Sequence, residues 1–459
     1  MTEELEARLS GYRKRGATRV KLGLTDVDGV LRGKYISLEK FASVMAKGGG
    51  FCDCVFGWDV DDVLYEGEGA ERAATGWHTG FPDARYRLVA ASERWLPTEN
   101  VPFFLGEFVD ENDEPHALCP RSRLGVLLDE LAGAGLSLMS GYEYEFFVFE
   151  ETPHSLREKG YRDLRPLTPG NFGYSVLRAS QAAEHFNGLM DRAEALGTPL
   201  EGLHCETGPG VWEGALAARA GIESADNAQV FKTFAKSFFH ERDLSATFMA
   251  KWSMDYPGQS GHYHFSLLDA SGNNVFHDPE DANGLSEMQR WVLGGLQQRL
   301  PELLALLAPT INSYTRLVQG AWAPTAATWG VENRTCALRV IAGGAGSQRI
   351  ECRVPGADAN PYLVGCAVLT AALDGIENRL QPDDPVRGNA YDVQAGLPAA
   401  RQFPAQLRGA AEQFSASEVA RKFLGDAFVD HFVMSRLWES QVYEQTVNTW
   451  QLERYFEII

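Results

Sequence analysis

Two glutamates in the first third of the chain are placed to do chemistry together. Glu143 and Glu145 lie in the stretch 141–149, whose aromatic and valine content predicts a β-strand. Side chains two residues apart in a strand point to the same face, so these carboxylates share one side of a sheet. Like charges this close raise each other's pKa unless a cation lies between them, which indicates a divalent metal ion. For this pair alone, a solvated strand edge remains the alternative.

Two further segments supply carboxylates. Glu206 and Glu213 flank a Gly-Pro-Gly turn and can converge from neighbouring strands, although surface hairpins also carry acids. Arg349, Glu351 and Arg353 alternate along a predicted strand, which places one carboxylate between two guanidinium groups on one face. A metal-binding carboxylate beside phosphate-binding arginines would have this arrangement.

A histidine segment follows a glycine-containing loop. His262, His264 and Ser266 alternate and share a face, and the loop before them begins at Gly258. Glycine lets a backbone approach a ligand closely, and imidazole suits contacts with a metal ion or a phosphate. A single histidine would more often be structural, whereas two with a serine make a functional and a structural role equally plausible.

Several glutamates with only two histidines favour Mg²⁺ or Mn²⁺ over zinc, because hard cations prefer oxygen ligands. Arg316, Arg334 and Arg339 lie near predicted turns or strands, and a guanidinium group suits carboxylates and phosphates. Metal ions together with arginines indicate phosphoryl transfer from a nucleotide. The sequence has no P-loop or protein-kinase motif, so an ATP site would be of another type.

The elements that must position these side chains fall into two units, residues 1–115 and residues 116–459. The polar segment 111–120 contains two prolines and is the predicted connection between the units. In the first unit we predict helices at 1–16 and 38–47, a hairpin over 20–36, and strand-like segments within 84–109. In the second unit the predicted helices span 121–134, 179–196, 225–240, 285–305, 360–378 and most of 405–458. The fold class is therefore α+β.

Composition excludes several classes of function. The 459 residues include 42 Lys and Arg against 62 Asp and Glu, a net charge of −20 that argues against a nucleic-acid partner. No apolar run approaches the length of a membrane span, and the Ala-rich stretch 366–373 predicts a core helix. The N-terminus is acidic and resembles no signal peptide. Seven scattered cysteines without zinc-site spacing predict reduced thiols in the cytoplasm.

The order of these segments resembles the glutamine synthetase superfamily across nearly the whole chain. The segments that carry the resemblance are Asp26-Val-Asp-Gly-Val-Leu-Arg-Gly-Lys34, Glu143-Tyr-Glu145, Glu206-Thr-Gly-Pro-Gly-Val-Trp-Glu213, Ala246-Thr-Phe-Met-Ala-Lys251, Gly261-His-Tyr-His-Phe-Ser-Leu267, Asn312-Ser-Tyr-Thr-Arg-Leu-Val318, Trp329-Gly-Val-Glu-Asn-Arg334, Arg349-Ile-Glu-Cys-Arg-Val-Pro355 and Asn360-Pro-Tyr-Leu363. The resemblance implies a β-grasp domain at 1–115 and a catalytic domain at 116–459, whose antiparallel sheet forms a half-barrel. It also implies stacked hexameric rings, as in a dodecamer, with each active site shared between neighbouring subunits.

The resemblance further implies a role for each motif residue, with two or three Mg²⁺ or Mn²⁺ ions per site and ATP as co-substrate. Ligands of the first ion would be Glu145, Glu206 and Glu213, and ligands of the second would be Glu143, His262 and Glu351. Glutamate or its γ-phosphate would be held by Gly258, Arg316, Arg334 and Arg353, and the nucleotide by His264, Ser266, Arg334 and Arg339. Arg334 and Arg353 would also act in catalysis, by offsetting charge on the transferred phosphoryl group.

The sequence departs from this family where the amine should bind. Glutamine synthetases carry a glutamate in the flap that follows the Asn-Ser-Tyr motif, and Trp322 stands at that position. Asp59 is the best match to the family's ammonium-binding aspartate, although the serines beside that residue are missing. Ammonium needs nearby carboxylates, whereas an indole offers an apolar face to an alkyl group or a cation. The branch of γ-glutamyl-amine ligases is therefore the expectation, with Trp322, Trp58 and Asp59 at the amine pocket and Asp59 as its base.

Several alternatives remain open at this stage. The chain is a glutamine synthetase if Trp322 only packs in the flap, and a non-catalytic scaffold of this fold is a third reading. Short alkylamines are favoured, but acidic residues at positions 61, 62, 66 and 68 would suit a polyamine, and Trp58 with Trp322 would suit an aromatic amine. Tyr391 falls where some glutamine synthetases are adenylylated, but one tyrosine in a loop does not predict regulation.

Overall fold

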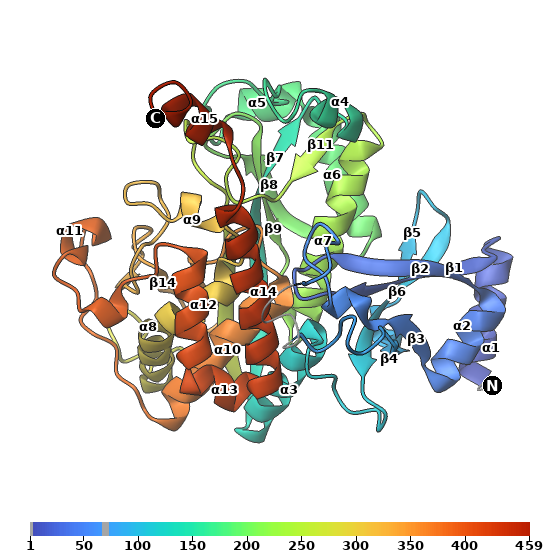
Figure 1. The fold of residues 1–459 in the computed structure, drawn as a ribbon. Coiled ribbons are helices and arrows are strands. Elements are labelled where there is room, and N and C mark those ends of the chain that lie inside the picture. Colours follow the sequence, from blue (N-terminus) through green and yellow to red (C-terminus); the bar gives the residue numbers. More distant parts are fainter. Residues whose placement is uncertain (1–2, 67–72) are drawn as a thin grey trace.

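The computed structural model describes residues 3–66 and 73–459 and contains two β-sheets with helices around them (Figure 1). The first sheet has the strand order β2-β1-β6-β4-β3, with β5 on β6. Its elements, with two helices, are α1 (Glu3–Lys14), β1 (Arg19–Thr25), β2 (Leu31–Ser37), α2 (Leu38–Lys47), β3 (Gly49–Cys52), β4 (Asp83–Leu88), β5 (Arg94–Leu96) and β6 (Val101–Val109). The predicted hairpin is confirmed, because β1 and β2 pair antiparallel. We call this part the first-sheet unit.

The second sheet has nine strands in the order β13-β14-β15-β12-β7-β9-β8, with β10 and β11 also on β7. Its strands are β7 (Leu136–Phe149), β8 (Leu200–Cys205), β9 (Val211–Leu216), β10 (Arg219–Ala220), β11 (Ser245–Thr247), β12 (Gly261–Asp269), β13 (Trp329–Val331), β14 (Leu338–Ile341) and β15 (Arg349–Cys352). The pairs along this order are antiparallel except for β13 with β14, which are parallel.

Helices cover the second sheet and fill most of the remaining chain. They are α3 (Pro120–Gly133), α4 (Pro153–Glu158), α5 (Val176–Gln181), α6 (Ala183–Ala195), α7 (Glu223–His240), α8 (Glu287–Leu307), α9 (Ser313–Arg316), α10 (Pro361–Glu377), α11 (Ala390–Gln394), α12 (Leu407–Ala416), α13 (Glu418–Leu424), α14 (Asp426–Glu444) and α15 (Thr449–Tyr455). The helix predicted at 179–196 is wrong in its bounds, because the chain breaks at Ala182, where ψ is 23°, and forms two helices. The α+β class is confirmed.

The central core lies between the second sheet and its helices. Along β7 the rings of Tyr142, Tyr144 and Phe146 are at most 2% exposed and face this core. Because side chains alternate in a strand, Glu143 and Glu145 face away from it, as predicted. The core helix predicted around 366–373 is part of α10, which is buried on all sides. No helix among the described residues is long and apolar enough to cross a membrane.

Helices α8 and α10 pack so closely that only glycine fits at their crossing. A Cβ atom on Gly295 would lie 2.1 Å from the carbonyl oxygen of Ala371 and 2.7 Å from the Cα atom of Gly375. Such distances are far inside van der Waals contact, so a side chain would force the two helices apart. The close packing keeps α10, and the loop that precedes it, in a fixed position behind the sheet.

A buried ion-pair network joins the first-sheet unit to the rest of the chain. Arg121 of α3 makes two hydrogen bonds of 3.0 Å to the carboxylate of Asp226 on α7, and a third of 2.6 Å to Glu107 on β6. Tyr362 of α10 donates to the same aspartate at 2.7 Å. Asp226 therefore fixes three helices to one another and, through Arg121, to the first sheet. The predicted boundary at residue 115 falls in the segment between β6 and α3.

We predict that Asp226→Ala lowers the free energy of unfolding by about 3–5 kcal/mol, because it leaves the buried guanidinium of Arg121 without its main partner. Chemical denaturation measures the effect. The matched control is Glu223→Ala on the same helix, whose ion pair with Arg219 is exposed and should contribute less than about 1 kcal/mol. Equal losses in both variants would contradict this account of the network.

Candidate active site

Strand register brings the acids of the second sheet together. Glu145 on β7 lies directly opposite Glu213 on β9, and Glu213 lies opposite His204 on β8. Glu206 follows the end of β8 and directs a carboxylate oxygen to within 3.2 Å of His204 Nε2. His204, Glu206 and Glu213 each offer one ligand atom, and these atoms lie within 4.8 Å of one another. We call these three residues the first cluster.

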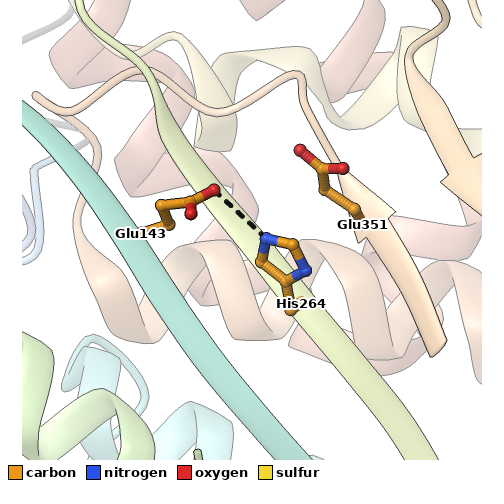
Figure 2. A group of neighbouring side chains, drawn as sticks. All are labelled: Glu143, His264 and Glu351. Carbon is orange, nitrogen blue, oxygen red and sulfur yellow. Dashed lines mark hydrogen bonds and ion pairs between the residues drawn. The ribbon is translucent and has the colours of Figure 1, made fainter. Parts of the chain in front are cut away.

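A second group of ligand atoms lies on the neighbouring strands. His262 on β12 is opposite Glu143 on β7, and His264 is opposite Glu351 on β15. Figure 2 shows the carboxylate of Glu143 directed at the ring of His264, with Glu351 on the far side of that ring. Glu143 Oε2 is 3.3 Å from both His262 Nδ1 and His264 Nε2. We call Glu143, His264 and Glu351, whose ligand atoms lie within 4.8 Å of one another, the second cluster.

The clusters overlap with the predicted ligand sets without being identical to them. In the first cluster His204 takes the place predicted for Glu145, whose Oε2 accepts a hydrogen bond of 2.8 Å from the amide of Ser260. In the second cluster His264 takes the place of His262, whose Nδ1 lies 3.3 Å from Glu143 and 3.5 Å from Glu351. Both predicted residues therefore border the cluster to which they were assigned, and the predicted ligand assignments stay predictions.

His204 is the residue that the sequence analysis missed. It stands two positions before Glu206, so the alternation of side chains in a strand could have placed it on the same face. Its ring stacks on that of Tyr174, with centroids 4.5 Å apart and an angle of 12° between the planes. Tyr174 comes from the segment before α5, and its side chain is 70% exposed. The aromatic ring thus covers one side of the first cluster.

Burial and neighbouring negative charge raise the pKa of two carboxyl groups in and beside the first cluster. Burial and the charges of Glu143 and Glu145 raise the pKa of Glu213 to about 10. Burial also raises the pKa of Glu145 to about 7, although the Ser260 amide and the charge of Arg316 oppose this effect. These carboxylates are short of positive charge, which is the environment that favours a bound divalent cation. The donor set of carboxylate oxygens with a few imidazoles fits Mg²⁺ or Mn²⁺.

Other acids of the site have local positive partners. Burial favours the neutral form of Glu143, but hydrogen bonds from His262 and His264 outweigh burial and lower its pKa well below the ordinary value. Burial likewise opposes the charges of His262 and Arg353, which lower the pKa of Glu351 to about 2. Such residues remain carboxylates at neutral pH and are ready to bind a cation.

The predicted arginines differ in what they contact. Arg316 is 2% exposed and donates to Ser260 Oγ and to the carbonyl oxygen of Val354, both at 2.9 Å. Arg353 pairs with Glu351 and is 7% exposed, while Arg339 donates to the other oxygen of Glu351 at 3.0 Å. Glu351 is therefore held between two guanidinium groups.

Arg334 and Gly258 are placed differently from these buried arginines. Arg334 is exposed, and its guanidinium makes no hydrogen bond or ion pair within residues 3–66 and 73–459. It is near enough to Tyr174 for its charge to act on the pKa of that phenol.

Gly258 packs against Arg316, and a Cβ atom there would lie 2.9 Å from Arg316 Cβ, so the loop needs glycine at this point.

A cavity of about 360 Å³ opens beside the second cluster. Its lining includes Glu143, His264, Ser266, Ser347 and Arg349. The structure thus brings two of the predicted nucleotide contacts, His264 and Ser266, to one cavity with Glu143, a carboxylate of the second cluster. A cavity of about 400 Å³ in the first-sheet unit contains none of the residues of either cluster.

No hydrogen bond or ring contact among the described residues joins Trp322 to Trp58 or Asp59. Trp322 is 63% exposed and has a φ of 59°. Asp59 Oδ1 accepts from the amides of Asp61 and Val63 at 2.9 and 3.0 Å, and its Oδ2 accepts from Trp438 Nε1 at 3.1 Å. No hydrogen bond or ion pair in the described part of the chain joins Asp59 to either cluster.

The remaining residues of the predicted amine pocket lie on the first-sheet unit. Trp58 lies under the guanidinium of Arg32, 5.0 Å from ring centroid to Cζ. Of the acids considered for a polyamine, Asp61, Asp62 and Glu66 are exposed, and Glu68 lies outside the described residues.

Comparison with known proteins agrees with this arrangement. The family model for the glutamine synthetase catalytic domain matches residues 117–455. The chain is 44% identical over 445 residues to the type-1 glutamine synthetase 2 of Dictyostelium discoideum, covering 96% of this chain and 84% of that protein. It is 35% identical over 448 residues to a glutamate–isopropylamine ligase of a Pseudomonas species, covering 97% of this chain and 96% of that protein. The solved structure of ligand-free GmaS matches with a TM-score of 0.84 at 27% sequence identity, covering 98% of this chain and 99% of that one.

We predict that Glu213→Gln changes the metal dependence of stability more than stability itself. Without metal, the raised pKa keeps Glu213 protonated at neutral pH, so replacing it with the neutral amide of glutamine leaves the melting temperature almost unchanged. With Mn²⁺ added, the stabilisation by binding shrinks because one ligand oxygen has lost its charge. Thermal unfolding with EDTA and then with Mn²⁺ measures both effects. Glu150→Gln, whose carboxylate pairs with Arg165 just beyond β7, is the control and keeps the full Mn²⁺ effect. A full Mn²⁺ effect in Glu213→Gln would contradict the first cluster as a metal site.

Proposed function

The chain belongs to the glutamine synthetase family, and from that premise we propose that it is an ATP-dependent ligase that joins the γ-carboxylate of glutamate to an organic amine. The observation that carries the choice of an amine is Trp322, an exposed indole at the flap position where glutamine synthetases carry a glutamate. The products would be a γ-glutamyl amide, ADP and phosphate. Such a reaction would begin the use of an amine as a source of nitrogen or carbon.

The chemistry follows from the weakness of a carboxylate as an electrophile. Transfer of the terminal phosphoryl group of ATP to the γ-carboxylate gives an acyl phosphate, from which an amine displaces phosphate. Divalent cations, when bound at the two clusters, would offset the charge of the transferring phosphoryl group. Arg353, fixed by Glu351, and the exposed Arg334 would contact that group from the protein side. Buried Arg316 would hold the Gly258 loop against the glutamate.

On the amine side, the indole of Trp322 would pack against the alkyl part of the substrate. Asp59 would accept the proton of the attacking amine at its Oδ2 atom. A hydrogen bond from Trp438 Nε1 holds this oxygen in place. Because no hydrogen bond or ring contact joins Asp59 or Trp58 to Trp322 among the described residues of one chain, we propose that a neighbouring subunit supplies them. This arrangement accords with the expected cytoplasmic assembly of hexameric rings, stacked as a dodecamer.

The second candidate is a glutamine synthetase that uses ammonia. The relative at 44% identity, named a glutamine synthetase, favours this candidate. The relative at 35% identity, named for isopropylamine, favours an organic amine. Trp322 discriminates between the two, because an indole supplies no carboxylate to bind ammonium.

The test is phosphate release from ATP with Mg²⁺ and glutamate across a panel of ammonia, methylamine, ethanolamine, isopropylamine, putrescine and aniline. We expect one organic amine to exceed ammonia in kcat/KM by orders of magnitude. If ammonia is the best substrate, the proposal of an organic amine is wrong. The identity of the best amine also decides between an alkyl, a hydroxyalkyl, an aromatic and a polyamine pocket.

We predict that Trp322→Glu raises kcat/KM for ammonia relative to the best organic amine by about tenfold or more, the value of a charge-assisted hydrogen bond. Trp322→Ala should raise KM for the organic amine by about tenfold, because the apolar contact between the indole and the alkyl part of the bound amine is lost. The control is Trp291→Ala on α8, where the indole lies under Arg379. This variant should leave the ammonia-to-amine ratio of kcat/KM and the KM for the organic amine unchanged. An unchanged ammonia-to-amine ratio in Trp322→Glu would mean that the flap residue does not select the substrate.

A further inference from the structure

The flap that carries Trp322, residues 317–326, is held by a short segment from a distant part of the chain. This segment, residues 388–394, contains α11, and we call it the bracket segment. The hydroxyl of Tyr391 donates to the carbonyl oxygen of Ala323 at 2.8 Å. Gln394 Oε1 accepts from Thr325 Oγ1 at 2.5 Å and from Gln319 Nε2 at 3.2 Å. The flap is therefore fixed on both sides of Trp322.

The other end of the bracket segment is attached to the loop that carries Arg334. Asn333 Nδ2 donates to the carbonyl oxygen of Gly388 at 2.8 Å. Thr335 Oγ1 accepts from the amide of Ala390 at 2.9 Å. One short helix thus connects the flap to the two residues that flank Arg334. Any shift of the bracket segment would move the amine side and the phosphate side of the site together.

The conformation of Trp322 gives this attachment a physical role. Its φ of 59° lies in the left-handed region, which an ordinary side chain adopts only at an energetic cost. Such a conformation persists when the surrounding structure enforces it. Tyr391 donates to Ala323, one position after Trp322. Gln394 accepts from Thr325, three positions after Trp322, and from Gln319, three positions before it.

Tyr391 also lies close to the glutamate side of the site. The positive charges of Arg316 and Arg353 reach its phenol, where they oppose the rise in pKa that burial causes. The ring is half-buried, and its hydroxyl is occupied by the bond to the flap. Tyr391 is thus hydrogen-bonded to the flap and close enough to the two buried arginines for their charges to act on it.

We propose that Tyr391 and Gln394 are positioning residues for the amine. They hold the flap so that the indole of Trp322 stays against the incoming amine, and in this way they set amine affinity and selectivity without touching the substrate. The inference rests on the proposed function in one respect, the assignment of Trp322 to the amine.

The first test is Tyr391→Phe, which removes one hydroxyl and one hydrogen bond. We expect KM for the best amine to rise about fivefold, the net worth of one hydrogen bond, while KM for ATP changes by less than about twofold. Gln394→Ala should act in the same direction. Tyr443→Phe is the matched control, because Tyr443 is exposed on α14, and it should leave every constant unchanged. Equal rises in KM for amine, glutamate and ATP, with a lower melting temperature, would indicate general loosening and would overturn the proposal.

The second test asks whether Tyr391 acts through Trp322. In a double-mutant cycle, Tyr391→Phe is added to Trp322→Ala, and we expect it to change the amine KM by less than about twofold there. Phosphate release with Mg²⁺, glutamate and ATP is the assay throughout. If the fivefold effect persists without the indole, Tyr391 does not position Trp322 and the inference is wrong.

These outcomes are separate from the test of the proposed function. The wild-type amine panel decides whether the substrate is an organic amine. If ammonia is the best substrate, the same cycle is run with ammonia. The positioning role then stands if the effect of Tyr391→Phe depends on Trp322, and falls if it does not.

Discussion

The structure depends on holding several carboxylates on one face of a sheet whose other face is the core. Along β7 the buried rings of Tyr142 and Tyr144 alternate with Glu143 and Glu145, so the strand cannot slip by one residue without burying charge in the core. The same alternation fixes β9 and β12 beside it. The acids are therefore buried and crowded by the same packing that stabilises the fold, and the raised pKa of Glu213 reflects burial first and the neighbouring charges second.

Crowding also explains how the site can serve phosphoryl transfer. Acids that repel one another bind divalent cations, and cations are what a transferring phosphoryl group needs. Glu351 joins the two requirements, because it belongs to the second cluster and pairs with both Arg339 and Arg353. In the proposed function the amine side is built differently, from an exposed flap held by the bracket segment.

The sequence predicted the faces of the strands but not all of their neighbours. Alternation placed Glu143 with Glu145 and His262 with His264, and the turns separated the strands that carry them. It also allowed Glu206 and Glu213 to converge from neighbouring strands, as β8 and β9 do, but His204 was missed because the alternation before Glu206 was not followed back to it. The order of the other strands is set by long-range packing rather than by local pattern. The same limit applies to Asp59, whose hydrogen bond to Trp438 joins residues far apart in the chain. The bracket segment was likewise invisible, since its few hydrogen bonds connect loops.

The central claim is that ATP activates the γ-carboxylate of glutamate at these clusters. The most direct measurement uses glutamate labelled with ¹⁸O in its γ-carboxylate, with unlabelled ATP, Mg²⁺ and the best amine. Mass spectrometry of the released phosphate then reports the path of one oxygen. The account predicts that each turnover transfers one labelled oxygen to phosphate, because the acyl phosphate loses that oxygen when the amine attacks. Unlabelled phosphate released in step with amide formation would contradict it.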